Sequence, residues 1–370
     1  MRKIITSIVL SAFCVFTASA QLEDGFYRVK NNKTKRYISI ADNNPKNYTI
    51  SQSGSTTLLG IRTIKSFDRV SCSPSTIIYV KNMDRNKNLY DLQGQGTGIY
   101  ALSGNTILAK LEGGGTSYKA SGSYSGITIN ISDLADDGQR EEAWLANNSE
   151  ETARWNFIKV DTDTNYIGIK PDVKTNDGYY GTIYAGFAFN FVSSGMKAYY
   201  VSKASGKGFE MKEITGTIPA NTPVIIKCAS DNPAENMIMP VIDATAKPSG
   251  NKLVGVYCAI KYKNSNMTPF TASTMRVLGV SDGKLAFIKK ASEDYLYQSK
   301  YLPANKAYLK VKSSDADIMT LGGSGIVNVT NDTESPSKEG IYTLTGIRLP
   351  DNASLRPGVY IKDGKKIVIK

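Results

Sequence analysis

Short runs of alternating apolar and polar residues recur along the chain, and this two-residue period is typical of half-buried β-strands. Turn-forming Asp-Gly pairs separate the runs, at 24–25, 137–138, 177–178, 282–283 and 363–364. The clearest helix candidate is one short stretch, Gln139 to Ala146. Many short strands bounded by turn signals indicate barrels or sandwiches, so the sequence predicts an all-β protein.

The first 20 residues have a different pattern. Arg2 and Lys3 precede a mostly apolar run, and Ala18 and Ala20 have the spacing of a cleavage site. These features predict a secretory signal peptide over residues 1–20. No later stretch approaches the roughly 20 apolar residues of a membrane-spanning helix, so no such helix is expected.

Repeated strand–loop–strand units indicate a first domain over residues 21–160. The units are Asp24–Ile40, Ser75–Gly98 and a degenerate third, Gly115–Ile131. Together with Trp155 they resemble the ricin-type β-trefoil, which implies three units closed into a barrel. Of the family's Q-x-W motif only Trp155 is kept, and the resemblance implies that it is a core residue.

The trefoil resemblance also implies a sugar-binding site. In that family an aspartate of each repeat binds sugar, and Asp91 is the nearest counterpart here. Tyr90 lies beside it, and a tyrosine ring can stack on a sugar face while its hydroxyl stays in water. Tyr90 and Asp91 are therefore the candidate ligand-binding residues.

A second domain is predicted over residues 161–321 from an internal echo. Ile218–Lys227 and Leu302–Lys310 each contain a Pro-Ala-Asn turn that leads into an apolar run. Two such copies suggest two related sheets and hence a β-sandwich-like domain. Residues 322–338 are rich in Gly, Ser, Asn and Thr and are interpreted as a linker.

The last segment, residues 339–370, predicts a small β module. Two β-branched runs flank Asp363 and Gly364, the favoured residues of a two-residue hairpin turn. The segment resembles the C-terminal sorting domain of cargo of the type IX secretion system. The residues that match are Gly340, Gly346, Arg348, Gly358, Tyr360, Gly364, Lys365 and Lys366.

The sorting-domain resemblance implies recognition by the secretion machinery of a Gram-negative bacterium. It also implies a protein that is secreted or attached to the outer-membrane surface. Gly178–Phe191, with the two echoes, resembles a β domain that often precedes such tails and implies no activity.

The charge balance is basic. Without Arg2 and Lys3 the 45 basic residues fall to 43 against 33 acidic ones, a net charge of +10. Such a balance favours anionic glycans, nucleic acid or acidic membranes. The lysines are scattered, however, with Lys30, Lys33 and Lys35 in the densest early group, and a solvated surface is the preferred interpretation. No nucleic-acid module is recognisable, so no nucleic-acid partner is expected.

The chain contains no histidine, which excludes Ser-His-Asp and Cys-His catalysis and His-ligated zinc. Gly279–Gly283 matches G-x-S-x-G, but its context predicts a hairpin turn instead of a nucleophile elbow. No catalytic residue, metal ligand or cofactor is assigned.

Two acidic segments have calcium-loop and structural interpretations. Asp161–Asn165 has the first ligand spacings of a calcium loop, but Tyr166 stands where the turn needs glycine, which favours an acidic linker. Asp133, Asp136, Asp137, Glu141 and Glu142 lie beside Trp144. For this group, a solvated helix start is preferred to a calcium site.

Three cysteines remain in the exported chain. Cys228 and Cys258 lie in one predicted domain and are candidates for a disulfide, which leaves Cys72 over. Three buried reduced thiols are an equally open alternative.

These features predict an exported, non-catalytic binding protein that recognises a glycan or a host-matrix ligand through its first domain. A structural or adhesive surface protein that binds protein partners is one alternative. A glycosidase or lyase that uses carboxylates is another, and it requires a pair of acids in a cleft.

Overall fold

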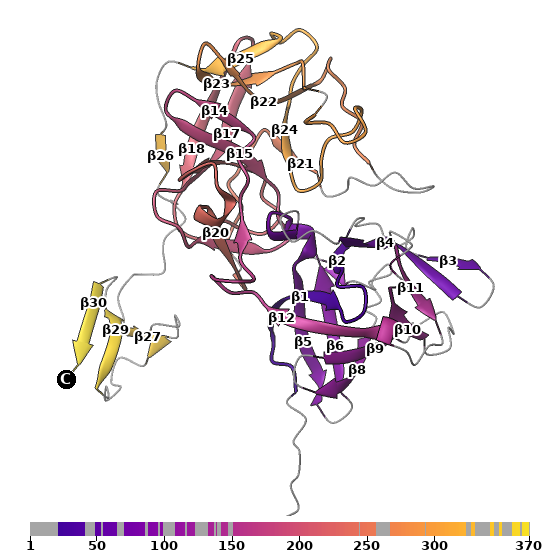
Figure 1. Ribbon diagram of the computed structural model, residues 1–370. Coiled ribbons are helices and arrows are strands. Elements are labelled where there is room, and N and C mark those ends of the chain that lie inside the picture. Colours follow the sequence, from indigo (N-terminus) through magenta and orange to yellow (C-terminus); the bar gives the residue numbers. More distant parts are fainter. Residues whose placement is uncertain are drawn as a thin grey trace, which may run out of the picture.

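The computed structural model describes residues 21–40, 49–52, 55–64, 70–85, 88–94, 97–98, 108–114, 117–122, 132–136, 138, 142–146, 151–243, 245–256, 267–292, 294–322, 327–329, 341–343, 348–349, 357–362 and 365–369. Nearly all of its regular elements are strands, which confirms the all-β prediction (Figure 1). The predicted signal peptide lies outside the described residues.

Twelve strands of the first region form one antiparallel sheet. They are β1 (Gly25–Asn31), β2 (Tyr37–Ile40), β3 (Thr49–Gln52), β4 (Ser55–Ile64), β5 (Ile78–Asp84), β6 (Leu89–Gly94), β7 (Thr97–Gly98), β8 (Leu108–Gly114), β9 (Ser117–Gly122), β10 (Ser132–Ala135), β11 (Glu142–Ala146) and β12 (Arg154–Lys159). The pairings β1–β12, β12–β9, β9–β8, β8–β6, β6–β5 and β5–β1 close a ring of six strands. The first two predicted units coincide with β1–β2 and with β5–β7.

The interior of this ring is aromatic. Trp155 is fully buried, and Phe157 packs edge-to-face against Tyr27 and Tyr118, with ring centroids 6.4 and 5.7 Å apart. Along β12 these rings alternate with outward-facing residues such as Arg154, as a strand period of two requires. The core of the first region therefore lies inside the ring.

The predicted helix at residues 139–146 is wrong, because residues 142–146 form strand β11. Leu145 pairs with Leu134 of β10 on one side and with Thr56 of β4 on the other. Ladder bonds to two neighbours outweigh a weak local helix preference. Asp133 and Glu142, two of the acidic residues near Trp144, therefore lie on strands, whereas Asp137 and Glu141 lie outside the described residues.

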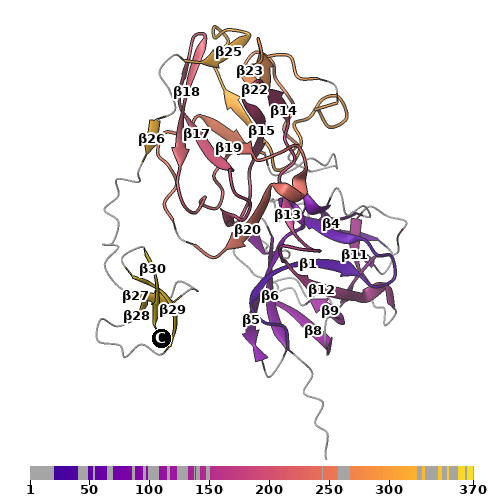
Figure 2. The same cartoon turned by 60° about the vertical axis from the view of Figure 1, so that its left-hand side comes forward.

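The second region contains two sheets. The smaller consists of β13 (Ile167–Gly168), β16 (Ala188–Phe191) and β20 (Met237–Val241). The larger consists of β14 (Val173–Thr175), β15 (Gly178–Ile183), β17 (Lys197–Ser205), β18 (Gly208–Ile214), β19 (Val224–Cys228), β21 (Leu253–Gly255), β22 (Met275–Ser281), β23 (Lys284–Ile288), β24 (Ala307–Lys310), β25 (Ile318–Leu321) and β26 (Val327–Val329). Figure 2 shows the larger sheet from a second side.

The central strands of the larger sheet are buried on both faces. Ala198 of β17 and Ile226 of β19 face one apolar cluster, which also contains Phe189 and Ile238 of the smaller sheet. On the opposite face, Tyr199 belongs to a second cluster with residues of β22, β23 and β24. The second region therefore has two cores that share the central strands.

The internal echo is confirmed as a pair of similar turns. Asn221 and Asn305 have φ of 54° and 59°, in the left-handed region that asparagine tolerates. Their backbone N–H groups donate to the carbonyl oxygens of Ala185 and Val256, at 2.8 and 2.7 Å. The turns lead into β19 and β24, which both belong to the larger sheet, so the inference that the two copies mark two separate sheets is wrong.

The G-x-S-x-G segment is confirmed as a hairpin. Ser281 of β22 pairs with Lys284 of β23, so two residues form the turn. Those residues, Asp282 and Gly283, have φ of 50° and 71°, as a type I′ turn requires.

The C-terminal segment forms its own four-stranded sheet. Its strands are β27 (Ile341–Thr343), β28 (Arg348–Leu349), β29 (Gly358–Lys362) and β30 (Lys365–Ile369). Lys362 pairs with Lys365, which confirms the two-residue hairpin connection. Of the residues that match the sorting domain, Gly340, Gly346 and Gly364 lie outside the described residues, and the others lie on β28, β29 and β30.

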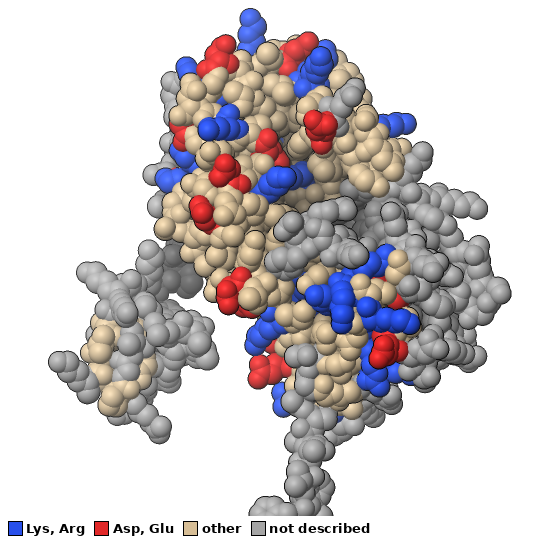
Figure 3. Space-filling model, in the orientation of Figure 1, with Lys and Arg blue, Asp and Glu red and all other residues tan. Residues whose placement is uncertain are grey.

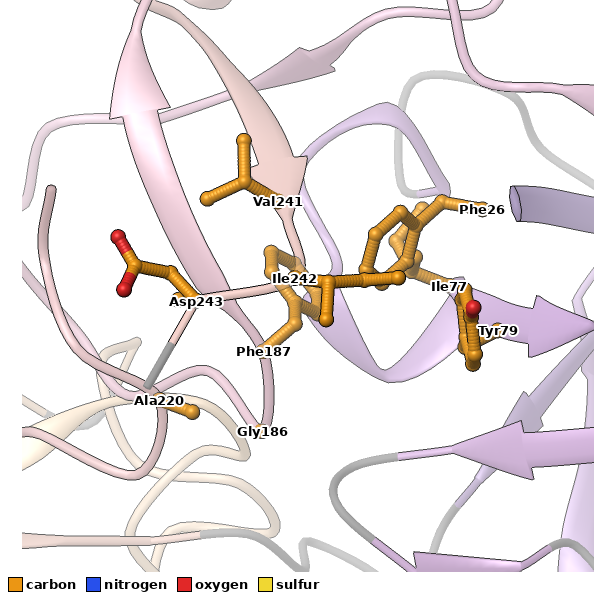
Figure 4. A pocket seen from close by; sticks show the side chains of 10 residues that line it. Phe26, Ile77, Tyr79, Gly186, Phe187, Ala220, Val241, Ile242 and Asp243 are labelled. Carbon is orange, nitrogen blue, oxygen red and sulfur yellow. The ribbon is translucent and has the colours of Figure 1, made fainter. Parts of the chain in front are cut away.

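Apolar contacts join the first and second regions. Ile77 belongs to the same core cluster as Ile167, and the rings of Phe26 and Phe187 are 6.0 Å apart. A groove of about 200 Å³ remains beside these rings (Figure 4). Ile242 lines it and is 75% exposed.

Candidate functional site: a basic face on the first region

The predicted sugar-binding residues lie in the interior. Tyr90 and Asp91 are on β6, and they are only 1% and 6% exposed. Tyr90 is flanked by paired residues on both sides, Asn82 of β5 and Ala109 of β8. Its ring packs in the core and is not presented to a ligand, and the Asp91 carboxylate is also covered.

The surface loop between β1 and β2 is organised by a fully buried asparagine. The side-chain oxygen of Asn31 accepts the backbone N–H groups of Lys33 and Thr34, both at 3.0 Å. Its amide donates to the carbonyl oxygen of Thr152 at 2.7 Å. Lys35 completes the turn in the left-handed region, with φ of 62°. The loop is thereby fixed with the side chains of Lys33 and Lys35 exposed.

An ion pair anchors the end of this loop. The Nε of Arg36 donates to the carboxylate of Asp136 at 2.9 Å, and Nη2 makes a second contact to the same group. Asp136 is fully buried and also accepts the N–H of Gly138 at 3.2 Å. Asp136 was predicted to lie at a solvated helix start, and this is wrong because it holds the loop to the sheet.

Strand register brings further basic residues beside the loop. Lys30 lies opposite Asn156 of β12, and Arg154 lies opposite Lys119 of β9. Directly opposed residues share a face, and so do residues two apart on one strand. Lys30, Arg154 and Lys119 therefore occupy one outer face, next to the loop.

We call this surface the basic face and define it as Lys30, Lys33, Lys35, Lys119 and Arg154. Figure 3 shows Lys and Arg side chains gathered over the part of the first region where Figure 1 draws β1, β2 and β12. Within the described part of the chain, no carboxylate forms an ion pair with Lys30, Lys33, Lys35 or Arg154.

Polar and aromatic contacts lie beneath the cations of the basic face. The side-chain amide of Asn32 donates to the hydroxyl of Ser117 at 2.7 Å. The side-chain oxygen of Asn32 has no hydrogen-bond partner among the described residues. Lys30 extends across the ring of Tyr37, with its Nζ 5.0 Å from the ring centre. The face thus presents cations, while the amide of Asn32 is bonded beneath them and its oxygen is buried.

The other end of the same outer face is closed. Arg28, two residues before Lys30 on β1, is fully buried. Its guanidinium donates to the side-chain oxygen of Asn165 at 2.9 Å and to the hydroxyl of Thr76 at 3.1 Å. Burial lowers the pKa of Arg28 to about 10. The segments that contain Thr76 and Asn165 cover this end, so only the Lys30 end is open to a ligand.

The acidic segment after β12, Asp161–Asn165, is held by hydrogen bonds among its own residues and to β12. The Asp161 carboxylate accepts the backbone N–H groups of Asp163 and Asn165, at 2.9 and 2.8 Å. The Asn165 amide donates to the carbonyl oxygen of Lys159 at 2.8 Å. Across the residues that the structure describes, no three His, Cys, Asp or Glu side chains converge as metal ligands.

The cysteines have different environments. Cys228 is a free thiol, 4% exposed, and burial raises its pKa to about 12. Cys72 is half-buried and also free. Cys258 lies outside the described residues, and because Cys228 is free, the predicted disulfide between the two is not formed.

No protein-family model matches this chain, and no curated protein or solved structure matches it at significant similarity. Among the described residues, no helix combines the length and the apolar composition needed to cross a bilayer.

Proposed function

We propose that this chain is an exported, non-catalytic protein that binds an acidic glycan through the basic face of its first region. One observation carries the proposal: strand register gathers Lys30, Lys33, Lys35 and Arg154 on one open surface without ion-pair partners among the described residues. Carboxylate or sulfate groups of a glycan supply the complementary charge, and charge-assisted hydrogen bonds to such groups are strong.

The closed ring of six strands in the first region supports a barrel of the kind that the β-trefoil resemblance implies. From the successive groups β1–β4, β5–β8 and β9–β12, the ring takes one, three and two strands. The signal-like N-terminus and the tail that resembles a sorting domain support export to the outer surface. An acidic glycan at a cell surface or in a matrix is a ligand that such a protein meets.

The pKa values of the described carboxyl groups favour a glycan-binding protein over a glycosidase. A glycosidase acid needs a raised pKa. Among the described carboxyl groups with a shifted pKa, Asp177, Asp315 and Asp317, the pKa is lowered in every case. Hydrogen bonds to the charged form cause these shifts, from Thr175, from the Lys312 backbone and from Lys289, respectively.

The proposal is tested with a glycan array that includes neutral, uronate-containing and sulfated glycans. The full mature chain is compared with Lys33→Glu/Lys35→Glu and with a control of equal charge, Lys207→Glu/Lys284→Glu. These are two exposed residues of the second region, one in a turn and one at the start of β23. We expect binding to acidic glycans to fall at least about tenfold for the first variant and to change little for the control.

Equal losses in both variants would show that net charge, and not the basic face, is responsible. If the protein binds no glycan on the array, the glycan proposal is rejected and the alternative of an adhesive protein with protein partners is favoured. Binding should also weaken with added salt, because exposed charges are screened over about 8 Å at physiological ionic strength.

A further inference from the structure

A second candidate site lies mainly in the second region, where two hollows are side by side and Cys72 and Pro74 of the first region close one edge. Their volumes are about 430 and 480 Å³, and Asp172, Ser292 and Tyr295 line both. Cavities of roughly 300–1,000 Å³ are typical of small-molecule sites. Neither hollow involves the basic face.

The fold creates this opening by leaving the curled larger sheet unclosed. β22 pairs with β24 only through Met275 and Arg276. Beyond these residues, β22 lies next to β14 instead of β24. The ends of β14 and β22 are joined by a backbone hydrogen bond from the N–H of Asn176 to the carbonyl oxygen of Gly283, at 2.8 Å. The second hollow lies along this seam, and the first adjoins it at Asp172 and Tyr295.

An ion pair forms the polar wall of the first hollow. The Asp172 carboxylate contacts the Lys306 ammonium at 2.6 Å and accepts the backbone N–H of Thr182 at 2.8 Å. The Asp172 side chain is 7% exposed and that of Lys306 is 23% exposed. Lys306 has three donors, of which one reaches Asp172 and one the carbonyl oxygen of Lys170. Its third donor has no partner among the described residues.

The first hollow is balanced in charge. Lys170 and Lys306 line it together with Asp172 and Asp294, so two cations meet two anions. A charged ligand would gain little there over its hydration in water. A neutral ligand with several hydroxyls can donate to Asp172 and accept from Lys306 without disturbing the balance.

Tyr295 separates the two hollows and has an unused polar group. Its hydroxyl is buried and lies close to the side chain of Thr182, but it makes no hydrogen bond of good geometry among the described residues. Burial raises the pKa of Tyr295 well above its ordinary value, so the phenol stays neutral. A buried hydroxyl with only this weak contact calls for an explanation, and a small shift of its ring would let an occupant of either hollow supply a better bond.

The second hollow is mainly apolar. Its walls include Val173 of β14, Val277 of β22 and Ile288 of β23. A sugar ring has a hydroxyl-bearing edge and an apolar C–H face, which match a polar wall joined to an apolar one. We propose that this cleft binds a neutral sugar unit, with its hydroxyls on Asp172, Lys306 and Tyr295.

Saturation-transfer NMR on the full mature chain tests the site. The probes are methyl glycosides of neutral hexoses at millimolar concentration, with glucuronate as the charged comparison. We expect a neutral hexoside to bind better than glucuronate. Tyr295→Phe, which removes only the hydroxyl, should weaken binding about tenfold without lowering the melting temperature.

Two further variants separate this inference from the proposed function. Lys306→Gln should also weaken hexoside binding, and it provides an independent test if Tyr295→Phe folds poorly. Lys33→Glu/Lys35→Glu should leave hexoside binding unchanged. The inference is overturned if no neutral hexoside binds, if glucuronate binds better, or if neither cleft variant reduces binding.

Discussion

The open face of the first region and the cleft of the second region use lysine in opposite ways. On the basic face, Lys33 and Lys35 are exposed, with no ion pair among the described residues. In the cleft, Lys306 is held by Asp172 at 2.6 Å and is partly buried. Solvated cations can bind an anion at little cost to the fold, whereas a paired, covered cation first stabilises the protein. Neighbours, not residue type, decide which role a lysine has.

The largest effect is expected where a cation is most completely enclosed. Arg28→Met should lower the free energy of unfolding by about 3 kcal/mol, because buried acceptors such as the Asn165 side chain and the Val70 carbonyl lose their donor. Lys30→Met, two residues away on the open part of the same face, should change it by less than about 0.5 kcal/mol. Urea denaturation measures both. Similar losses would show that the two ends of the face are not distinct.

The ion pair of the cleft should come next. Asp172→Ala leaves Lys306 partly buried without its partner and removes the acceptor of the Thr182 N–H, so we expect a loss of about 2 kcal/mol. The control Glu210→Ala breaks a more exposed pair with Lys203, at 3.2 Å, and should cost about 1 kcal/mol or less. If the two variants are equally stable, the cleft pair is not structural.

Whether the sequence predicts a structural feature depends on how far apart in the chain the residues that determine it lie. The hairpin at Asp282 and Gly283 and the turns at Asn221 and Asn305 follow from a few adjacent residues, and they were predictable. Each needs only a residue that tolerates positive φ.

Long-range pairing was not predictable in this way. Leu145 belongs to a strand because Thr56, far back in the chain, pairs with it. The basic face likewise needs the register that carries Arg154 beside the loop of Lys33. Tyr90 shows a related failure, since alternation predicts that one strand face is buried without indicating which.

A pH-dependent effect should appear in the core of the second region. Burial raises the pKa of Cys228 from 9.0 to about 12, so the folded protein keeps a proton that the unfolded chain releases. Stability is therefore complete below pH 9 and falls as pH rises, by up to about 1.4 kcal/mol per pH unit. Cys228→Ala should show a smaller decrease just above pH 9, where Tyr180 and Tyr199, with ordinary pKa values of 10.0, contribute little. Equal slopes for both proteins would contradict a free, buried thiol.

The smallest effect on stability, and the sharpest test of the comparison, is expected on the basic face. Lys33→Glu/Lys35→Glu should change the free energy of unfolding by less than about 0.5 kcal/mol, because both side chains are exposed and Asn31 holds the loop through backbone groups. The same variant should remove much of the salt dependence of binding to a sulfated glycan, measured by titration calorimetry at two salt concentrations.

Asn31→Ala makes the opposite change: it keeps both lysines but removes the hydrogen bonds that fix the loop. It should lower stability by about 1–3 kcal/mol, since the N–H groups of Lys33 and Thr34 lose their acceptor. If Asn31→Ala binds acidic glycan as well as the parent protein, charge alone is enough and the fixed geometry of the loop is not required.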